Sequence, residues 1–239
     1  MKFFPSITTG NNSNWREKIK EADFLRLEEV AIFPTFLDRI ERKSLYDLIE
    51  RSSIKRIPLV HLREDMTIEE LDFLVDKYET KVFNTHSSRE FNIENQWIVK
   101  YGKMIYIENT HSSPLDSDEI KKYAGICLDF SHLENFRILD TERYEKERDI
   151  LNNFKIGCNH IAAIKPEFSS NNFKKELKRD SHYLEDLSEL DYLKKYPVSY
   201  FSNYCAMELA NKLEEQINAI KYIESFMKER DSFINKIVE

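Results

Sequence analysis

The sequence predicts an α/β fold: a single closed (β/α)8 barrel of parallel strands, formed by one domain that spans residues 1–239. Short apolar runs alternate with longer charged, amphipathic segments, which is the pattern of repeated βα units. Runs such as VAIF, MIYI and GICL are continuously apolar, as is typical of parallel strands covered on both faces. The length of 239 residues is close to the roughly 250 residues that such barrels usually contain.

The eight expected strands are separated by segments with helical periodicity. Strands are expected at 2–7, 29–34, 57–62, 81–86, 104–109, 125–130, 156–162 and 198–208. Helices are expected from a cap at Ser13 or Asn14 through 26, at 37–52, 67–79, 116–124, 141–154 and 209–238. Thr67 and Glu70 form the sequence pattern of a capping box at the start of one of them. The polar segment 166–181 is interpreted either as a loop with a short helix or as a lid or anionic-substrate contact at the barrel mouth.

Composition excludes several classes of function. Only four glycines are present, and neither a GxGxxG nor a GxxxxGK[ST] motif occurs, which argues against a Rossmann or P-loop nucleotide site. The net charge of -7 does not favour nucleic acid or anionic membrane over the whole surface, although a local basic cleft remains open.

The cysteines and the hydropathy pattern indicate the compartment. Cys127, Cys158 and Cys205 lie in apolar strand-like runs without a CxxC spacing, so buried, reduced thiols are expected rather than metal ligands. No apolar stretch approaches the roughly 20 residues of a membrane span, and the first residues lack the layout of a secretion signal. We therefore expect a soluble, cytoplasmic protein without a membrane partner.

Five histidines and four carboxylates lie at or just beyond the ends of the apolar runs. They are His61, His86, Glu108, Asp129, His132, His160, Asp180, His182 and Glu208. Because the carboxyl ends of parallel barrel strands converge on one mouth, these side chains are expected to meet there. Imidazole nitrogen and carboxylate oxygen suit zinc, and also manganese or iron. Taken singly, each histidine is more often a hydrogen-bonded structural residue, but the joint pattern favours a metal site.

The remaining histidine, His111, lies three residues beyond Glu108. We expect it to be a structural residue at the rim of the barrel rather than a hydrogen-bond donor to one of the metal ligands.

Several segments carry a family resemblance over nearly the full length of the chain. They are LVH, NTH, IYIENT, GICLDFSH, IGCNHI, RDSH and AMELAN. In this order they resemble the xylose-isomerase-like TIM-barrel superfamily and, within it, the endonuclease IV type of AP endonuclease. The resemblance implies a zinc-dependent phosphodiester hydrolase with up to three zinc ions, which orient the phosphodiester, activate water and stabilise the leaving oxygen.

The resemblance also implies a ligand set for each ion. The first ion would be held by His61, His86 and Glu108. Glu108 would bridge to a second ion held by Asp129, His160 and Glu208. The third ion would be held by His132, Asp180 and His182.

An alternative is a sugar or sugar-phosphate isomerase or epimerase. Such members of the superfamily resemble this chain at Glu108, Asp129, His160 and Glu208, which would hold a single Mn2+ or other divalent ion. Glu108 and Glu208 would then act as the acid–base pair on either face of the sugar carbon. A third interpretation is a barrel that binds metal without turnover.

The sequence leaves the partners open. The substrate is expected to be a small phosphoester, a sugar or DNA. The long amphipathic C-terminal helix, with Leu213, Ile217, Ile220, Ile223 and Met227 on one stripe, could also pack on a partner chain and form an oligomer.

Overall fold

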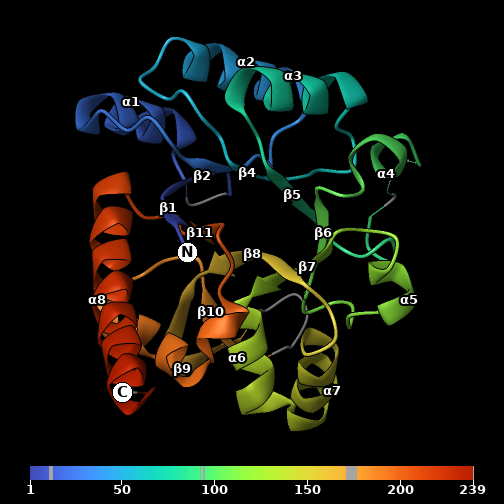
Figure 1. Ribbon diagram of the computed structural model, residues 1–239. Helices are drawn as coiled ribbons and strands as arrows, with labels where there is room; N and C mark the ends of the chain where they lie inside the picture. Colours follow the sequence, from blue (N-terminus) through green and yellow to red (C-terminus); the bar gives the residue numbers. More distant parts are fainter. Residues whose placement is uncertain (11–12, 92, 94, 171–176, 239) are drawn as a thin grey trace.

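The computed structural model describes residues 1–10, 13–91, 93, 95–170 and 177–238 (Figure 1). Nine parallel strands form one sheet in the order β1-β11-β8-β7-β6-β5-β4-β3-β2. The strands are β1 (Phe3–Phe4), β2 (Ser6–Thr8), β3 (Ala31–Phe33), β4 (Leu59–His61), β5 (Val82–Thr85), β6 (Ile105–Glu108), β7 (Gly125–Asp129), β8 (Ile156–Ile161) and β11 (Cys205–Met207).

The sheet closes into a ring through the first residues of the chain. β1 pairs with β11, and β2, which follows directly after Pro5, pairs with β3. The carbonyl of Pro5 accepts a hydrogen bond from the amide of Ala31, so β1 and β2 together occupy one strand position of the barrel. The prediction of an α/β fold with a closed parallel barrel is thereby confirmed.

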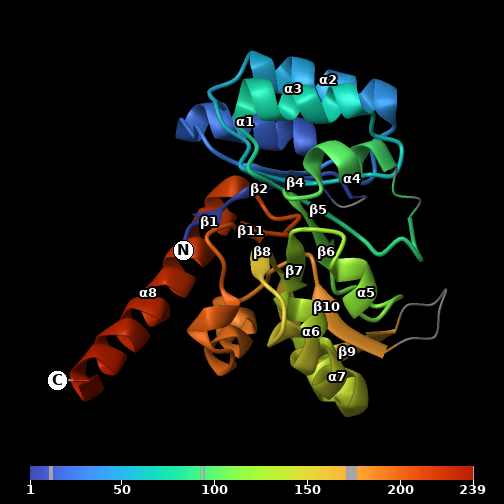
Figure 2. The same ribbon diagram turned by 45° about the vertical axis from the view of Figure 1, so that its right-hand side comes forward.

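Helices surround the strands (Figure 1). They are α1 (Trp15–Leu25), α2 (Arg39–Glu50), α3 (Ile68–Tyr78), α4 (Asn95–Tyr101), α5 (Ser117–Ile120), α6 (Phe130–Leu139), α7 (Thr141–Leu151) and α8 (Leu213–Val238). Two begin at expected caps: the Asn14 side chain accepts from the Glu17 amide at α1, and Thr67 and Glu70 form the reciprocal capping box of α3. Figure 2 shows the second half of α8 extending away from the barrel.

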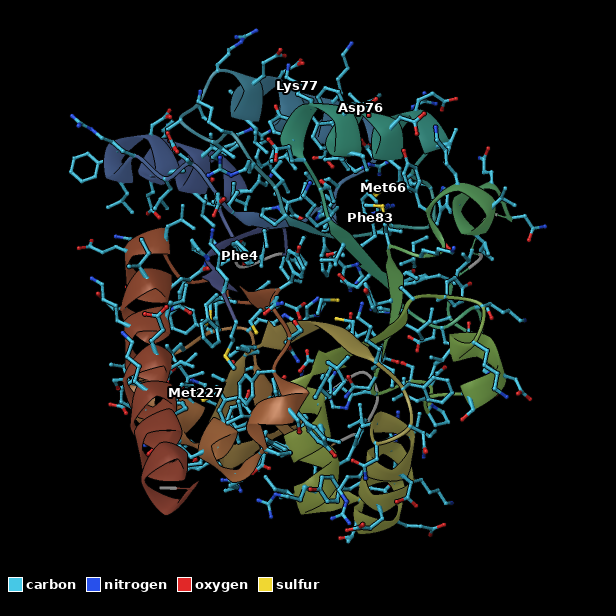
Figure 3. The ribbon with its side chains drawn as sticks, in the orientation of Figure 1. Phe4, Met66, Asp76, Lys77, Phe83 and Met227 are labelled. Atoms are coloured by element: carbon cyan, nitrogen blue, oxygen red, sulfur yellow. The ribbon has the colours of Figure 1, made fainter. Side chains whose placement is uncertain are left out.

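Apolar side chains fill the inside of the ring and the layer between strands and helices. Phe4 and Phe33 belong to the inner cluster, whereas Phe83 packs toward the outer helices and Met227 of α8 packs against the barrel (Figure 3). The three cysteines are buried and free, as expected for reduced thiols. Within the described residues, no helix is both long enough and apolar enough to cross a membrane.

Inside the ring, a glycine makes room for an aromatic side chain. A Cβ atom on Gly157 would lie 1.9 Å from Cε1 of Tyr106, so only glycine lets the Tyr106 ring pack against β8.

Two helices, α4 and α6, form where none was expected, and two expected segments take another form. The expected strand 198–208 begins instead with a 3-10 turn, η2 (Val198–Tyr200), in which the Tyr200 amide donates to the carbonyl of Pro197. Only β11, at the end of this segment, is a strand. In the described part of segment 166–181, β9 (Ala163–Ser170) and β10 (Leu177–Ser181) pair as antiparallel strands, which were not expected there; the rest of the segment, residues 171–176, lies outside the described residues. Between β10 and η2 lies a longer 3-10 segment, η1 (Leu187–Lys195).

Three expected boundaries also shift. Phe130, expected in a strand, is the first residue of α6, because the Asp129 side chain caps that helix. α5 is a single turn that ends at Ile120. The last helix starts at Leu213, four residues later than expected.

Candidate metal centre

The candidate residues lie where the barrel strands end. His61, Glu108 and Asp129 are the last residues of β4, β6 and β7. His160 is near the end of β8, and Glu208 follows β11. Because all these strands are parallel, their carboxyl ends bring the five side chains to one mouth of the barrel.

One group of donor atoms is formed by His61, His86 and Glu108, whose candidate ligand atoms all lie within 4.8 Å of one another. His61 Nε2 is 3.3 Å from Glu108 Oε2. The other ring nitrogen, His61 Nδ1, lies 2.8 Å from the carbonyl of Leu62 and donates to it. In the neutral ring this bond places the proton on Nδ1 and directs Nε2 toward Glu108 as a ligand atom, the arrangement usual for a metal-binding histidine.

A second group joins Glu108, Asp129, His160 and Glu208, again with ligand atoms within 4.8 Å of one another. His160 Nδ1 lies 3.3 Å from Glu108 Oε2 and 3.2 Å from Glu208 Oε2. Glu108 therefore belongs to two groups. Cys127 is also near Glu108 and His160, but burial raises the pKa of its thiol, which disfavours a thiolate ligand.

A third group contains His111, His132 and Asp180. His132 follows Asp129 in the first turn of α6, and its Nδ1 lies 2.8 Å from the carbonyl of Asn109, which leaves Nε2 as the ligand atom. Asp180 comes from β10. The structure thus brings eight of the nine sequence-predicted residues into these groups and adds His111.

His182 lies outside all the candidate groups that the described residues form. Its side chain is 51% exposed, and its Nε2 is 3.8 Å from Glu208 Oε1. It therefore faces the edge of the second group rather than Asp180.

Two buried asparagines support the candidate ligands, and the sequence analysis did not single them out. Asn84 Nδ2 donates to Glu108 Oε2 over 2.8 Å. Asn109 binds both the amide and the carbonyl of Asp129, which ties the ends of β6 and β7 together. The sequence could have indicated them, because an asparagine in or next to an apolar strand is expected to be buried and then needs a polar partner.

Buried polar atoms without hydrogen-bond partners are concentrated in this region. They include both ring nitrogens of His160, Asp129 Oδ2, Asp180 Oδ1 and Glu208 Oε2. Asp129 illustrates the pattern, because its Oδ1 caps α6 while its Oδ2 is left without a hydrogen bond. Buried donors and acceptors are normally satisfied, so this set fits bound cations with nitrogen and oxygen ligands.

The buried carboxylates shift the pKa values of one another and of the neighbouring histidines. Burial raises the pKa of Asp129, and the charges of Glu208 and Glu108 add to the effect. Burial would also raise the pKa of Glu108. The neighbouring His160 and His61 outweigh this effect and hold the pKa of Glu108 well below its usual range. Burial lowers the pKa of His132, yet Asp129 and nearby carboxylates overcome this and raise it to about 9. The region carries an excess of negative charge, which divalent cations would neutralise.

A cavity of about 300 Å³ opens beside the second group. Glu208 and His182 line it together with three aromatic side chains, Phe33, Phe36 and Tyr183. A larger cavity of about 740 Å³ lies at α7, and none of the candidate ligands lines it. The smaller cavity therefore offers a route by which a ligand can reach Glu208.

Fold and site together define a parallel α/β barrel with an imidazole–carboxylate cluster at its mouth. No family model matches the chain, and no curated protein is similar to it in sequence. A solved structure with a similar arrangement is the apo form of the 3-keto-D-glucoside 4-epimerase YcjR from E. coli. It shares 12% identity, with a TM-score of 0.43 over 94% of this chain and 100% of that one. These comparisons do not support the endonuclease IV resemblance in particular, and at this similarity they do not carry an activity from one protein to the other.

Proposed function

We propose that this protein is a divalent-metal-dependent hydrolase of phosphoesters, with zinc as the favoured ion. The observation that carries the proposal is the position of Glu108, which belongs to two adjacent donor groups, with a third group beside them. A carboxylate shared between neighbouring ions is the arrangement of multinuclear phosphoesterases and nucleases. A single-metal enzyme would need only Glu108, Asp129, His160 and Glu208.

When bound, the ions would act as Lewis acids on the phosphoryl oxygens, the attacking water and the leaving oxygen. The chain's own residues hold that arrangement in place. Asn84 fixes one oxygen of Glu108, and the Leu62 carbonyl fixes the tautomer of His61. Glu208 lies at the boundary between the second group and the 300 Å³ cavity, so it faces both the ions and a substrate.

The cavity sets the class of substrate. Its volume of about 300 Å³ matches the lower end of small-molecule sites. Phe36 and Tyr183 line it and are 62% and 49% exposed, so they offer ring faces to a substrate. We therefore favour a small phosphoester with a planar or apolar group over an extended duplex, which the net charge of -7 would repel.

The second candidate is a sugar or sugar-phosphate isomerase or epimerase that uses one divalent ion. The observation that favours it is the convergence of Glu108 and Glu208 on one atom, His160 Nδ1, at 3.3 and 3.2 Å. Two carboxylates flanking one site can exchange a proton on opposite faces of a carbon next to a carbonyl. The epimerase found in the structure comparison belongs to this class, although a TM-score of 0.43 does not decide between the candidates.

The test combines metal content with two assays on the purified full-length chain. Zinc and manganese per chain are measured by mass spectrometry after removal of loosely bound ions. Hydrolysis is followed with bis(4-nitrophenyl) phosphate and with an oligonucleotide that carries an abasic site. Proton exchange is followed as solvent deuterium uptake into a panel of ketoses and ketose phosphates.

About three ions per chain with phosphoester hydrolysis would support the main proposal. A single exchangeable ion with deuterium uptake would support the second candidate instead. The control is Glu108→Gln, purified in parallel, because hydrolysis that persists in this variant comes from a contaminating enzyme or from elsewhere on the protein.

A further inference from the structure

We infer that His111 is a ligand of a divalent cation, together with His132 and Asp180. This inference rests on the proposed metal centre but assigns a residue that the sequence pattern did not. It also concerns binding rather than catalysis, so it can be tested without any knowledge of the substrate.

The geometry of the three side chains suits one ion. His111 Nε2 lies 3.1 Å from Asp180 Oδ1, and the rings of His111 and His132 have centroids 4.3 Å apart. The candidate ligand atoms of the three residues are within 4.8 Å of one another, as two ligands of the same zinc ion must be. Zinc commonly takes two imidazoles and a carboxylate and keeps a further position for water or substrate.

The donor atoms have no competing hydrogen bonds. His111 Nε2 and Asp180 Oδ1 are both buried without a hydrogen-bond partner. Asp180 is only 3% exposed, so an unsatisfied oxygen there is costly unless a cation binds it. His132 is oriented by the carbonyl of Asn109, which directs its Nε2 away from the backbone.

The position of His111 is fixed by α6 and α7. Arg143 of α7 donates to the carbonyl of His111 over 2.7 Å and to the carbonyl of Ser113 over 3.0 Å. The ring of His111 also packs edge-on against Phe136 of α6, with centroids 5.5 Å apart. This support holds the imidazole in place before any ion binds, which lowers the cost of binding.

The corresponding residue of the sequence-based prediction, His182, is less well placed. It is half exposed and nearest to Glu208, whereas the His111 side chain is 28% exposed and directed at Asp180. An ordinary ion pair between His111 and Asp180 would give a similar distance without a metal. The experiment must therefore distinguish a ligand from an ion-pair partner.

The experiment compares His111→Phe with the matched variant His182→Phe. Phenylalanine keeps the aromatic contact with Phe136 and removes both ring nitrogens. Each full-length protein is stripped with a chelator, reloaded with Zn2+ and freed of excess ion, and zinc per chain is measured. Circular dichroism of the stripped proteins checks that the fold is retained, and His111→Ala replaces the first variant if it does not fold.

We expect His111→Phe to lose about one zinc ion relative to the wild type and His182→Phe to retain it. Unchanged stoichiometry in His111→Phe would overturn the inference and leave an ion pair as the explanation. A wild type that binds only about one ion would also overturn it. If the wild type binds about three ions but hydrolyses no phosphoester, the proposed function fails while the role of His111 is still tested by the variants.

Discussion

Asn84 of β5 and Glu108, the last residue of β6, lie on neighbouring strands of the barrel, and the amide of Asn84 donates to Glu108 Oε2 over 2.8 Å. This oxygen is also the one nearest to His61 and His160, at 3.3 Å from each. One hydrogen bond therefore fixes the carboxylate that two donor groups share. Such bonds orient metal ligands, and their loss usually weakens metal binding.

Asn84→Ala is predicted to weaken binding of the tightest ion by about 10- to 100-fold, because Glu108 loses the group that orients it. The measurement is competition for zinc with a chromophoric chelator. Asn159→Ala is the matched control, since its amide is hydrogen-bonded to main-chain groups of Leu128, Tyr200 and Ser202. Equal zinc affinity in Asn84→Ala and the wild type would remove this role.

Glu108→Gln is predicted to lower phosphoester hydrolysis by about 10³-fold, because a neutral amide cannot compensate the charge of two ions. Initial rates at saturating zinc measure the effect. Glu134→Gln changes another buried glutamate, which contacts Arg137, Lys195 and Tyr196, and should keep the activity of whatever fraction folds. Near-normal turnover in Glu108→Gln would exclude this residue from the reaction.

Stability is predicted to depend on pH through Lys18. Its ammonium donates to Thr8 Oγ1 and to the carbonyl of Leu209, and burial lowers its pKa to about 7. The unfolded chain keeps the usual pKa of 10.5 and so binds more protons between the two values. The contribution of Lys18 to stability therefore rises with pH from about 7 to 10.5, with a slope of up to about 1.4 kcal/mol per pH unit.

Urea unfolding of the wild type and of Lys18→Met between pH 7 and 10 measures this slope. The comparison is of the two pH profiles, because tyrosines and cysteines common to both proteins also titrate in this range. Subtracting one profile from the other should leave the rise that belongs to Lys18. Parallel profiles would show that Lys18 stays charged in the folded protein.

Gly157→Ala is predicted to destabilise the barrel by about 1–3 kcal/mol or more, because the new methyl group would meet the Tyr106 ring at 1.9 and 2.1 Å. Urea unfolding of the purified protein gives the free energy. Tyr106→Leu removes the ring, so the double variant should recover part of the loss. No recovery would place the conflict in the backbone rather than in this contact.

Much of the architecture could be predicted from local sequence. Continuous apolar runs such as MIYI marked the strands, and the Thr67–Glu70 capping box marked the start of α3. These signals are local because they depend on burial of a short run or on hydrogen bonds within one helical turn. These signals predicted the order of the barrel strands, and therefore that the carboxyl ends of the strands lie on one side of the barrel.

The segment after β8 could not be predicted in this way. β9 and β10 pair with each other and pack against α6, where the amide of Arg179 donates to Asn135 Oδ1 over 2.8 Å. The hydroxyl of Tyr192, in η1, donates to the carbonyl of Ala162. Partners 30 or more positions away in sequence position the described part of this region, and its polar composition alone does not indicate them.

The sequence by itself determined that His61, Glu108, Asp129, His160 and Glu208 would meet, because parallel strands carry their last residues to one mouth. Only the tertiary structure decided which histidine lies within ion-pair distance of Asp180, namely His111. That choice depends on how α6 and α7 hold the segment after β6, where Arg143 and Phe136 fix His111. Strand direction is encoded locally, whereas the placement of a ring on a connecting segment depends on packing between residues far apart in the chain.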